Sequence, residues 1–588
     1  MLVFRAPSPF ALLRAHAMRW VAILLLCTST VGCASVPDNV PRTPSHALET
    51  PEDTALGKLV VARRGSARSD SGFMLLSSVD LAFGGRVALI DAAQRTLDLQ
   101  YYAIHADSST EILLEHLRAA AQRGVRVRIL LDDFNTAGED AQVLRLAFVK
   151  GVEMRLFNPL PGSRGSLVGK ILGSLHQADH IQKRMHNKLF IADNAWGIAG
   201  GRNLGDAYFG GDGESAFVDL DVLAAGAVVK QMSSSFDRYW NNDLAYPVHT
   251  LLDKRDLDRL EKKEPSKEHG EATPPAKPGM KKVTAQQQQQ PQAAAPSPSQ
   301  PTVRTQPGPT VLPNASPTPS PAQGRPLDLQ QAPLTWAPAA LLADKPGKVA
   351  PGDDEVQAGE TVVDGLLQLV SQARQEVLII SPYFVPGAEM MRLFAELRGR
   401  GVAVRVLTNS LASNDAPAAH AGYKRYREDL LKLGVELHEM RSDPATAGLQ
   451  TYAPPAGKDD RGAARLGSGS GPGGSKSGTS RASLHSKAVI IDRRLAVIGS
   501  MNLDLRSQQK NSEVALLIRS PALAGQAAKL IENAFAHSSY RVELRDGHLH
   551  WLAPQGASFP DATSEPEADW KLKLLVDVLA PIAPEQML

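Results

Sequence analysis

The sequence predicts an α/β protein of two pseudo-symmetric α-β-α domains, packed so that one site lies at their interface. The same succession of strand, helix and strand occurs in both halves of the 588-residue chain, and alternating strands and helices are typical of layered α/β folds. A short polar motif also occurs once in each half, and a low-complexity segment separates the halves. The hydrophobic content of 43% is sufficient for a sizeable core.

Residues 1–33 have the features of a targeting segment. Arginines precede a short apolar run, Val21–Leu26, which is too short to span a bilayer comfortably as a structural helix. Gly32 and Cys33 follow in a small-residue stretch that resembles a bacterial lipoprotein cleavage box, although Thr30 stands where leucine is usual. We therefore predict export and lipidation of Cys33. An ordinary signal peptide and an uncleaved anchor are the alternatives.

Two low-complexity segments divide the remaining chain. Residues 261–330 are rich in proline and glutamine, a composition that buries too little apolar surface to fold, so a disordered linker is predicted. Residues 457–481 are rich in glycine and serine and indicate a flexible surface loop. The predicted order is a tether (34–70), a first domain (71–260), the linker, a second domain (331–555) that contains the loop, and a C-terminal tail (556–588).

The two halves begin with matching β-α-β units. Residues 89–105 and 113–133 of the first half indicate a helix end, a buried strand, an amphipathic helix and a valine-rich strand. Residues 369–386 and 391–410 of the second half have the same pattern, again with a glycine near the end of the helix. The apolar C-terminal stretch 570–584 carries two lysines; it can lie on a membrane surface or pack against the body.

The polar motif has the same spacing in both copies: H-x-K, four residues, D, six residues, then G-G/S-x-N. Side chains two apart on a strand share a face, so histidine and lysine project together. Each copy has one histidine, and joining the halves supplies the second. The corresponding residues are His186, Lys188, Asp193, Gly201 and Asn203 in the first half, and His485, Lys487, Asp492, Ser500 and Asn502 in the second.

These residue types suit phosphodiester chemistry. A neutral imidazole can attack phosphorus, and a second, protonated imidazole can give its proton to the leaving oxygen. Lysines, asparagines and backbone N–H groups can hold the phosphoryl oxygens as charge develops. An acid hydrogen-bonded to each imidazole would fix its tautomer.

The paired motif resembles the phospholipase D superfamily over most of the chain. The flanking stretches LDLQYY, KRMHNK, GGRNLGDAYF and DLDV resemble its cardiolipin synthase branch, in particular the bacterial cardiolipin synthase C type. The resemblance implies that one motif histidine forms a phosphohistidine and the other serves as acid, then base; we favour His186 as the nucleophile. It implies phosphate binding by the two lysines, Asn203, Asn502, Ser500 and Gly201, and no metal or cofactor.

The resemblance also addresses the acids. It counts Asp193 and Asp492 with the catalytic motif but gives them a structural, ion-pairing role. Glu513 matches the family position for an acid that supports a histidine. Its counterpart in the first half is Asp219 or Asp221, which share a face by alternation. Alignment of DLDV with NSEV favours Asp221.

The predicted activity is phosphatidyl transfer that makes cardiolipin from phosphatidylglycerol and a second phospholipid, phosphatidylglycerol or phosphatidylethanolamine. A hydrolytic phospholipase D and a nuclease of the same superfamily are the enzymatic alternatives, and an envelope scaffold is the non-enzymatic one. The formal net charge of +2 disfavours nucleic acid. We expect a membrane surface but no obligate protein partner. The expected location is the periplasm-facing cell envelope, with the outer membrane favoured because Ala34 and Ser35 lack the aspartate linked to inner-membrane retention.

Overall fold

The computed structural model describes residues 36–161, 164–165, 170, 181–210, 215–252, 254–262, 325–350, 361–443 and 481–582. The predicted targeting segment with Cys33, most of the predicted linker and nearly all of the predicted Gly/Ser loop lie outside these ranges. Within the described part of the chain, no helix is both long and apolar enough to cross a membrane.

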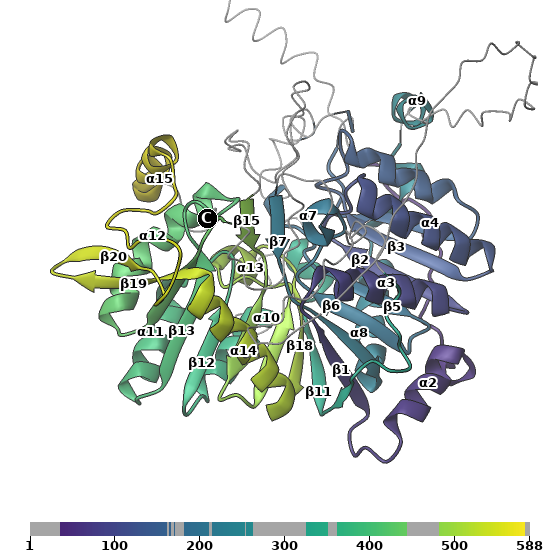
Figure 1. The fold of residues 1–588 in the computed structure, drawn as a ribbon. Helices are drawn as coiled ribbons and strands as arrows, with labels where there is room; N and C mark the ends of the chain where they lie inside the picture. The colour runs from purple at the N-terminus through teal and green to yellow at the C-terminus, as the bar shows by residue number, and fades with distance from the viewer. Residues whose placement is uncertain are drawn as a thin grey trace, which may run out of the picture.

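Each half of the chain forms a nine-stranded sheet, and the two sheets have closely similar strand orders (Figure 1). The first runs β10 (Thr335–Trp336), β1 (Ser71–Leu76), β8 (Asp221–Gly226), β6 (Trp196–Gly200), β5 (Leu189–Ala192), β2 (Thr96–Tyr101), β3 (Arg126–Asp132), β4 (Val152–Phe157) and β9 (Ala245–Pro247). The second runs β11 (Ala339–Ala343), β18 (Val514–Arg519), β17 (Leu495–Gly499), β16 (Ala488–Ile491), β12 (Glu376–Ile380), β13 (Ala403–Asn409), β14 (Glu436–Met440), β19 (Ser539–Arg545) and β20 (His548–Leu552).

The parallel part of each sheet is the predicted β-α-β region. Strands β2, β3 and β4 are parallel, as are β12, β13 and β14. Helices α4 (Ser108–Gln122) and α11 (Gly387–Gly399) connect the first two strands of each set. The chain leaves these helices through Gly124 and Gly401, whose φ angles of 92° and 79° favour glycine.

Helices cover the outer face of each sheet, and a shared core fills the space between the sheets (Figure 1). Helices α3 (Val79–Ala92) and α4 pack on the first sheet, and α10 (Val362–Ser371), α11 and α12 (Pro417–Lys432) pack on the second. The shared core contains residues of both sheets together with α8 (Ala227–Trp240) and α14 (Pro521–His537). The predicted α/β fold of two similar halves is confirmed.

Three predicted boundaries differ from the structure. The predicted tether contains η1 (Pro51–Asp53) and α2 (Ala55–Arg64), and Leu56 is buried in the outer core of the first domain. The end of the predicted linker joins that domain too, because Leu329 is buried in its core and the Leu327 N–H donates to the Gly84 carbonyl. The start of the predicted second domain also joins it, because β10 pairs with β1. The predicted tail folds back through α15 (Trp570–Ile582), which packs on α12. Each segment carries apolar residues that a domain surface can bury.

Candidate active site

The two histidines and lysines of the motif lie directly before central strands of their sheets. His186 and Lys188 precede β5, and His485 and Lys487 precede β16. The Lys188 ammonium donates to the His186 carbonyl oxygen at 2.9 Å, and the Lys487 ammonium donates to that of His485 at 2.5 Å. All four residues are buried. The expected arrangement, with histidine and lysine on one face, is present in both halves.

Backbone pairing between the halves brings the two motifs together. Strand β15 (Arg481–Leu484), just before His485, pairs in parallel with β7 (Ser215–Val218) of the first half. The His485 N–H donates to the Val218 carbonyl at 2.8 Å. In the same way, the His186 N–H donates to the Ser512 carbonyl at 2.9 Å. Each histidine is therefore fixed against the segment of the other half that leads into an acid.

Each imidazole contacts a carboxylate from the opposite half. His186 Nδ1 lies 3.0 Å from Glu513 Oε2, and His485 Nδ1 lies 2.6 Å from Asp219 Oδ2. The sequence-based preference for Asp221 is wrong. The Asp221 carboxylate instead accepts from Arg86 at 3.0 Å and lies 3.4 Å from Arg202, in a buried ion-pair cluster.

The strand register explains why the alignment chose the wrong acid. Gly200 pairs with Asp221, whereas its counterpart Gly499 pairs with Ala515. Glu513 lies two residues before Ala515, and two residues before Asp221 is Asp219. The alignment of DLDV with NSEV missed this two-residue shift. Strand alternation could not detect it either, because Asp219 and Asp221 share a face.

Ser500 and Gly201 position the carboxylates of Glu513 and Asp219. The Ser500 hydroxyl donates to Glu513 Oε2 at 2.5 Å and accepts from the Val514 N–H at 3.0 Å. A Cβ atom at Gly201 would lie 2.3 Å from the Asp219 Oδ1, so only glycine leaves room for that carboxylate. Both residues therefore shape the acids, and the direct phosphate contact predicted for them stays a prediction.

The motif aspartates are structural and lie away from the histidines. Asp193 and Asp492 are each the first residue of a three-residue loop, between β5 and β6 and between β16 and β17, and φ is positive at each aspartate and at the residue after it. Each carboxylate accepts three backbone N–H groups at the start of the neighbouring strand, at residues 94–96 and 374–376 respectively. The expected structural role is therefore present through backbone hydrogen bonds, and neither aspartate has an ion pair among the residues that the structure describes.

The two motif asparagines lie near the histidines in different surroundings. Asn203 accepts from the Ala103 N–H at 3.3 Å and donates to the Tyr208 hydroxyl at 3.0 Å. The amide oxygen of Asn502 is buried and has no hydrogen-bond partner in the described part of the chain. Both amides remain candidates for holding a phosphoryl group together with the lysines.

Burial and clustered charge set the protonation of the site. Burial, and then the charges of Lys188 and Lys487, hold the pKa of both histidines well below 6.5. Burial lowers the pKa of Lys188 to about 7 and raises that of Glu513 to about 7. Burial also raises the pKa of Asp219 above its usual value. Without a bound anion, neutral imidazoles are therefore favoured.

Several positioning residues were missed by the sequence interpretation. At the ends of β3 and β13, the side chains of Asp132 and Asn409 hold the residues that precede the histidines: Asp132 accepts from the Met185 N–H at 2.8 Å, and Asn409 accepts from the Leu484 N–H at 2.8 Å. Polar residues at the carboxyl ends of parallel strands were the available signal.

Two further residues hold Glu513 in place, and a tyrosine ring flanks each histidine. Asp344 accepts the Glu513 N–H at 2.8 Å, and the Ser507 hydroxyl donates to Glu513 at 2.9 Å. Tyr102 packs edge-on against His186, and Tyr208 packs edge-on against His485. No sequence motif marks Asp344, because it lies 169 residues before the acid that it holds.

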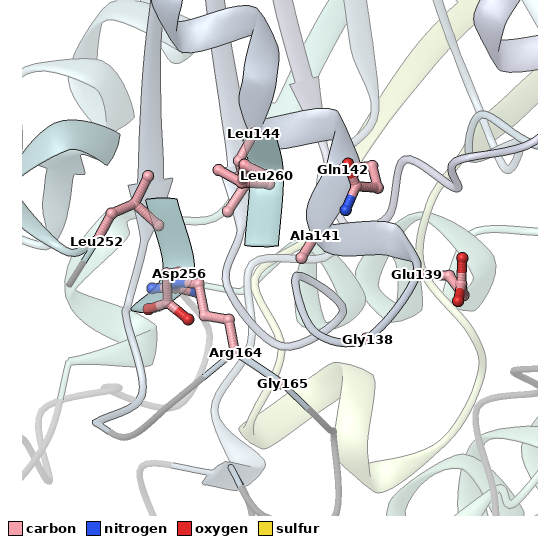
Figure 2. Close-up of a pocket in the computed structure, with 10 residues that line it drawn as sticks. All are labelled: Gly138, Glu139, Ala141, Gln142, Leu144, Arg164, Gly165, Leu252, Asp256 and Leu260. Carbon is pink, nitrogen blue, oxygen red and sulfur yellow. The ribbon is translucent and has the colours of Figure 1, made fainter. Parts of the chain in front are cut away.

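A separate cavity of about 330 Å³ lies in the first half, between η2 (Asp140–Phe148) and α9 (Lys254–Lys262) (Figure 2). Its described lining contains Leu144, Leu252 and Leu260 beside Arg164, and no motif residue. Among the residues that the structure describes, no group of three or more His, Cys, Asp or Glu side chains is placed to hold a metal ion. Metal independence stays a prediction.

The geometry defines a class of site: two buried histidines at a domain interface, each oriented by an acid, with two lysines beside them. The family described as "Cardiolipin synthase, PLD-like domain" matches residues 87–240, 366–452 and 461–537. The chain belongs to this phospholipase D-like cardiolipin synthase family, and the protein is a phosphatidyltransferase of the phospholipase D superfamily.

Individual relatives agree with this family. The chain is 33% identical to cardiolipin synthase C of Escherichia coli (strain K12) over 524 residues, 88% of this chain and 95% of that protein. It is 24% identical to cardiolipin synthase A of Pseudomonas entomophila (strain L48), covering 85% of this chain and 77% of that protein. The structure of phosphatidylserine synthase from Haemophilus influenzae Rd KW20 has the same fold, with a TM-score of 0.51, 13% identity, and coverage of 90% and 99%.

Proposed function

We propose that the protein makes cardiolipin by transferring a phosphatidyl group to phosphatidylglycerol. The observation that carries this proposal is the pair of cross-domain contacts, His186 to Glu513 and His485 to Asp219. Both Nδ1 atoms face carboxylates, so both Nε2 atoms are left for the substrate. The donor is phosphatidylglycerol or phosphatidylethanolamine.

We assign His186 as the nucleophile, because its acid is held by two side-chain hydroxyls and lies farther from the imidazole than the acid of His485 does. Its acid, Glu513, shares its charge with the hydroxyls of Ser500 and Ser507. Arg506 lowers the pKa of His186 through its charge, and Arg202 does the same for His485, so these arginines do not distinguish the two. His485 contacts Asp219 at a shorter distance, 2.6 Å, and an ionised carboxylate that close stabilises the imidazolium needed in a general acid.

The reaction then proceeds in two steps. His186 Nε2 attacks phosphorus, the bond from phosphorus to the head-group oxygen breaks, and that oxygen takes the Nε2 proton of His485. In the second step, the hydroxyl of phosphatidylglycerol gives its proton to His485 and attacks phosphorus, which breaks the phosphorus–nitrogen bond. Bound phosphate supplies the negative charge that offsets Lys188 and Lys487 and lets His485 hold its proton.

The membrane association of the protein is part of the same proposal. Phospholipid substrates lie in a bilayer, and the lipoprotein-like segment ending at Cys33 would anchor the chain to the periplasm-facing side of the envelope. The outer membrane is favoured over the inner one by the residues that follow Cys33. Labelling with a radioactive or alkyne fatty acid should modify the protein and be lost in Cys33→Ala.

The direct test is a lipid product assay. Purified protein with EDTA is incubated with vesicles of phosphatidylglycerol and phosphatidylethanolamine. Cardiolipin with released glycerol or ethanolamine supports transfer and identifies the donor. Phosphatidic acid without cardiolipin would make the protein a hydrolase. No lipid turnover by folded protein would reject the proposal and direct the search to nucleic-acid substrates.

A further inference from the structure

Helix α15 has two apolar faces, of which only one is covered by protein. On its inner face, Val576 is 1% exposed and packs with Leu411 and Ala421 in a small core. Two contacts to α12 also hold the helix: Lys424 pairs with Asp577, and Arg425 donates to the Ala580 carbonyl. The helix is therefore fixed on the second domain.

The outer face of α15 consists of four large apolar side chains that are open to solvent. Trp570, Leu574, Leu575 and Val578 are 69%, 54%, 40% and 53% exposed. Their spacing places them on one side of the helix. The other exposed large apolar residues of the described chain, Val61, Phe148 and Leu257, are spread over α2, η2 and α9. Contiguous exposed apolar side chains mark interaction sites, whereas scattered ones do not.

Two lysines lie beside this face. The amino group of Lys571 lies 5.9 Å from the centre of the Trp570 ring, and Lys573 follows two residues later and donates to the Ser564 hydroxyl at 3.3 Å. Three neighbouring acids are in ion pairs: Asp577 with Lys424, Glu567 with Arg441, and Glu565 with Arg427. A fourth, Asp569, accepts the Leu572 N–H at 2.8 Å. Lysines beside a tryptophan and leucines match the interface of an anionic bilayer.

A structural connection joins α15 to the catalytic centre. Leu411, which packs on Val576, follows two residues after Asn409. The Asn409 amide accepts from the Leu484 N–H and donates to the Leu484 carbonyl, and the next residue is His485. In Figure 1, α15 lies beyond α12 on the side of the second domain where β15 also lies. A membrane contact at α15 would therefore lie on the same side of the second domain as β15, the strand that leads into His485 (Figure 1).

We propose that the outer face of α15 (Trp570, Leu574, Leu575 and Val578) inserts into the interface of an anionic phospholipid bilayer and presents the active site to its substrate. This inference rests on the proposed function, because only an enzyme acting on bilayer lipids gains from this contact. A second copy of the chain fits less well: a stable dimer buries about 800 Å² per partner, far more than one helix face supplies.

Tryptophan fluorescence of the full chain tests the contact without any activity. Vesicles of phosphatidylglycerol and phosphatidylethanolamine are prepared with and without brominated acyl chains, and the protein is compared with Trp570→Phe. Insertion by about 5–10 Å, the depth typical of interfacial helices, should let bromine quench the Trp570 contribution. Trp570 emission that brominated vesicles do not quench would overturn the proposal. A blue shift of the emission that appears with rising protein concentration in the absence of vesicles would also overturn it, because it would indicate a second copy of the chain.

Kinetics separate docking from chemistry. The triple variant Trp570→Gln, Leu574→Gln and Val578→Gln should lower turnover of vesicles about tenfold, because lost apolar burial weakens interfacial binding. Turnover of monomeric short-chain phosphatidylglycerol should be unchanged. The matched control Val61→Gln removes an equally exposed apolar residue on α2 and should change neither. Equal vesicle turnover in the triple variant and the wild type would overturn the inference. Inactivity of the wild type on both substrates would instead reject the proposed function. In that case, the fluorescence measurement would still decide whether α15 contacts the bilayer.

Discussion

The two halves of this protein place the same motif at equivalent positions but surround its histidines differently. His186 contacts Glu513, a carboxylate fixed by the hydroxyls of Ser500 and Ser507. His485 contacts Asp219 at a shorter distance, beside Gly201, where a serine would clash. The duplicated motif therefore supplies two histidines, and the small local differences between them fit the different roles that we propose for them.

The largest effect should come from removing either histidine. His186→Ala and His485→Ala should each lower phosphatidyl transfer by at least roughly 10³-fold, since each step needs a nucleophile or a proton carrier. A lipid phosphodiester with a p-nitrophenol leaving group, which needs no protonation, distinguishes the two. His485→Ala should then accumulate a phosphatidyl adduct on the peptide containing His186, detectable by mass spectrometry. An adduct on His485 in the His186→Ala protein would reverse the assignment.

The next largest contrast is between two neighbouring aspartates. Asp219→Asn should lower turnover by about 10²-fold or more with little loss of stability, because the imidazole of His485 loses its orienting charge. Asp221→Asn should instead destabilise the fold by about 3 kcal/mol, because Arg86 and Arg202 keep their buried charges without the carboxylate. Denaturant unfolding and the lipid assay measure the two effects. The opposite pattern would restore Asp221 as the acid.

Exchanging the small residues beside the two acids tests whether the His186–Glu513 and His485–Asp219 pairs differ in function. Gly201→Ser should lower turnover about 10²-fold, because its Cβ displaces the Asp219 carboxylate and shifts His485. Ser500→Gly removes only one of the two hydroxyls that donate to Glu513, so a loss of about tenfold is expected. Similar losses in both variants would mean that the two sites are chemically equivalent.

The smallest effect concerns stability and pH. In the folded protein the pKa of each histidine lies well below 6.5, so the unfolded chain binds more protons as pH falls. Stability is then lost below about pH 6.5, by up to about 1.4 kcal/mol per histidine at pH 5.5. His485→Gln should therefore gain stability relative to the wild type between pH 7.5 and 5.5. A pH-independent difference in the free energy of unfolding would contradict the lowered pKa.

Much of the site could be predicted from residue spacing. The two H-x-K segments are local patterns with a strand following each, and strand periodicity fixes which side chains share a face. The supporting acid of the first half could not be chosen, because Asp219 and Asp221 alternate onto the same face and only the register of β8 against β6 separates them. The family resemblance implied an ion-pairing role for the motif aspartates, but positive φ at the turn directs their carboxylates to backbone N–H groups.

The sequence by itself determined the duplicated α/β fold, the family and the two histidines, because these depend on short-range periodicity and on residue identities at fixed spacing. Only the tertiary structure decided which acid serves which histidine, since His186 and Glu513 are 327 residues apart and meet through pairing between the halves. It also placed α15, because whether an apolar helix packs inward or remains exposed depends on the surface available to it, here α12, and not on its own residues.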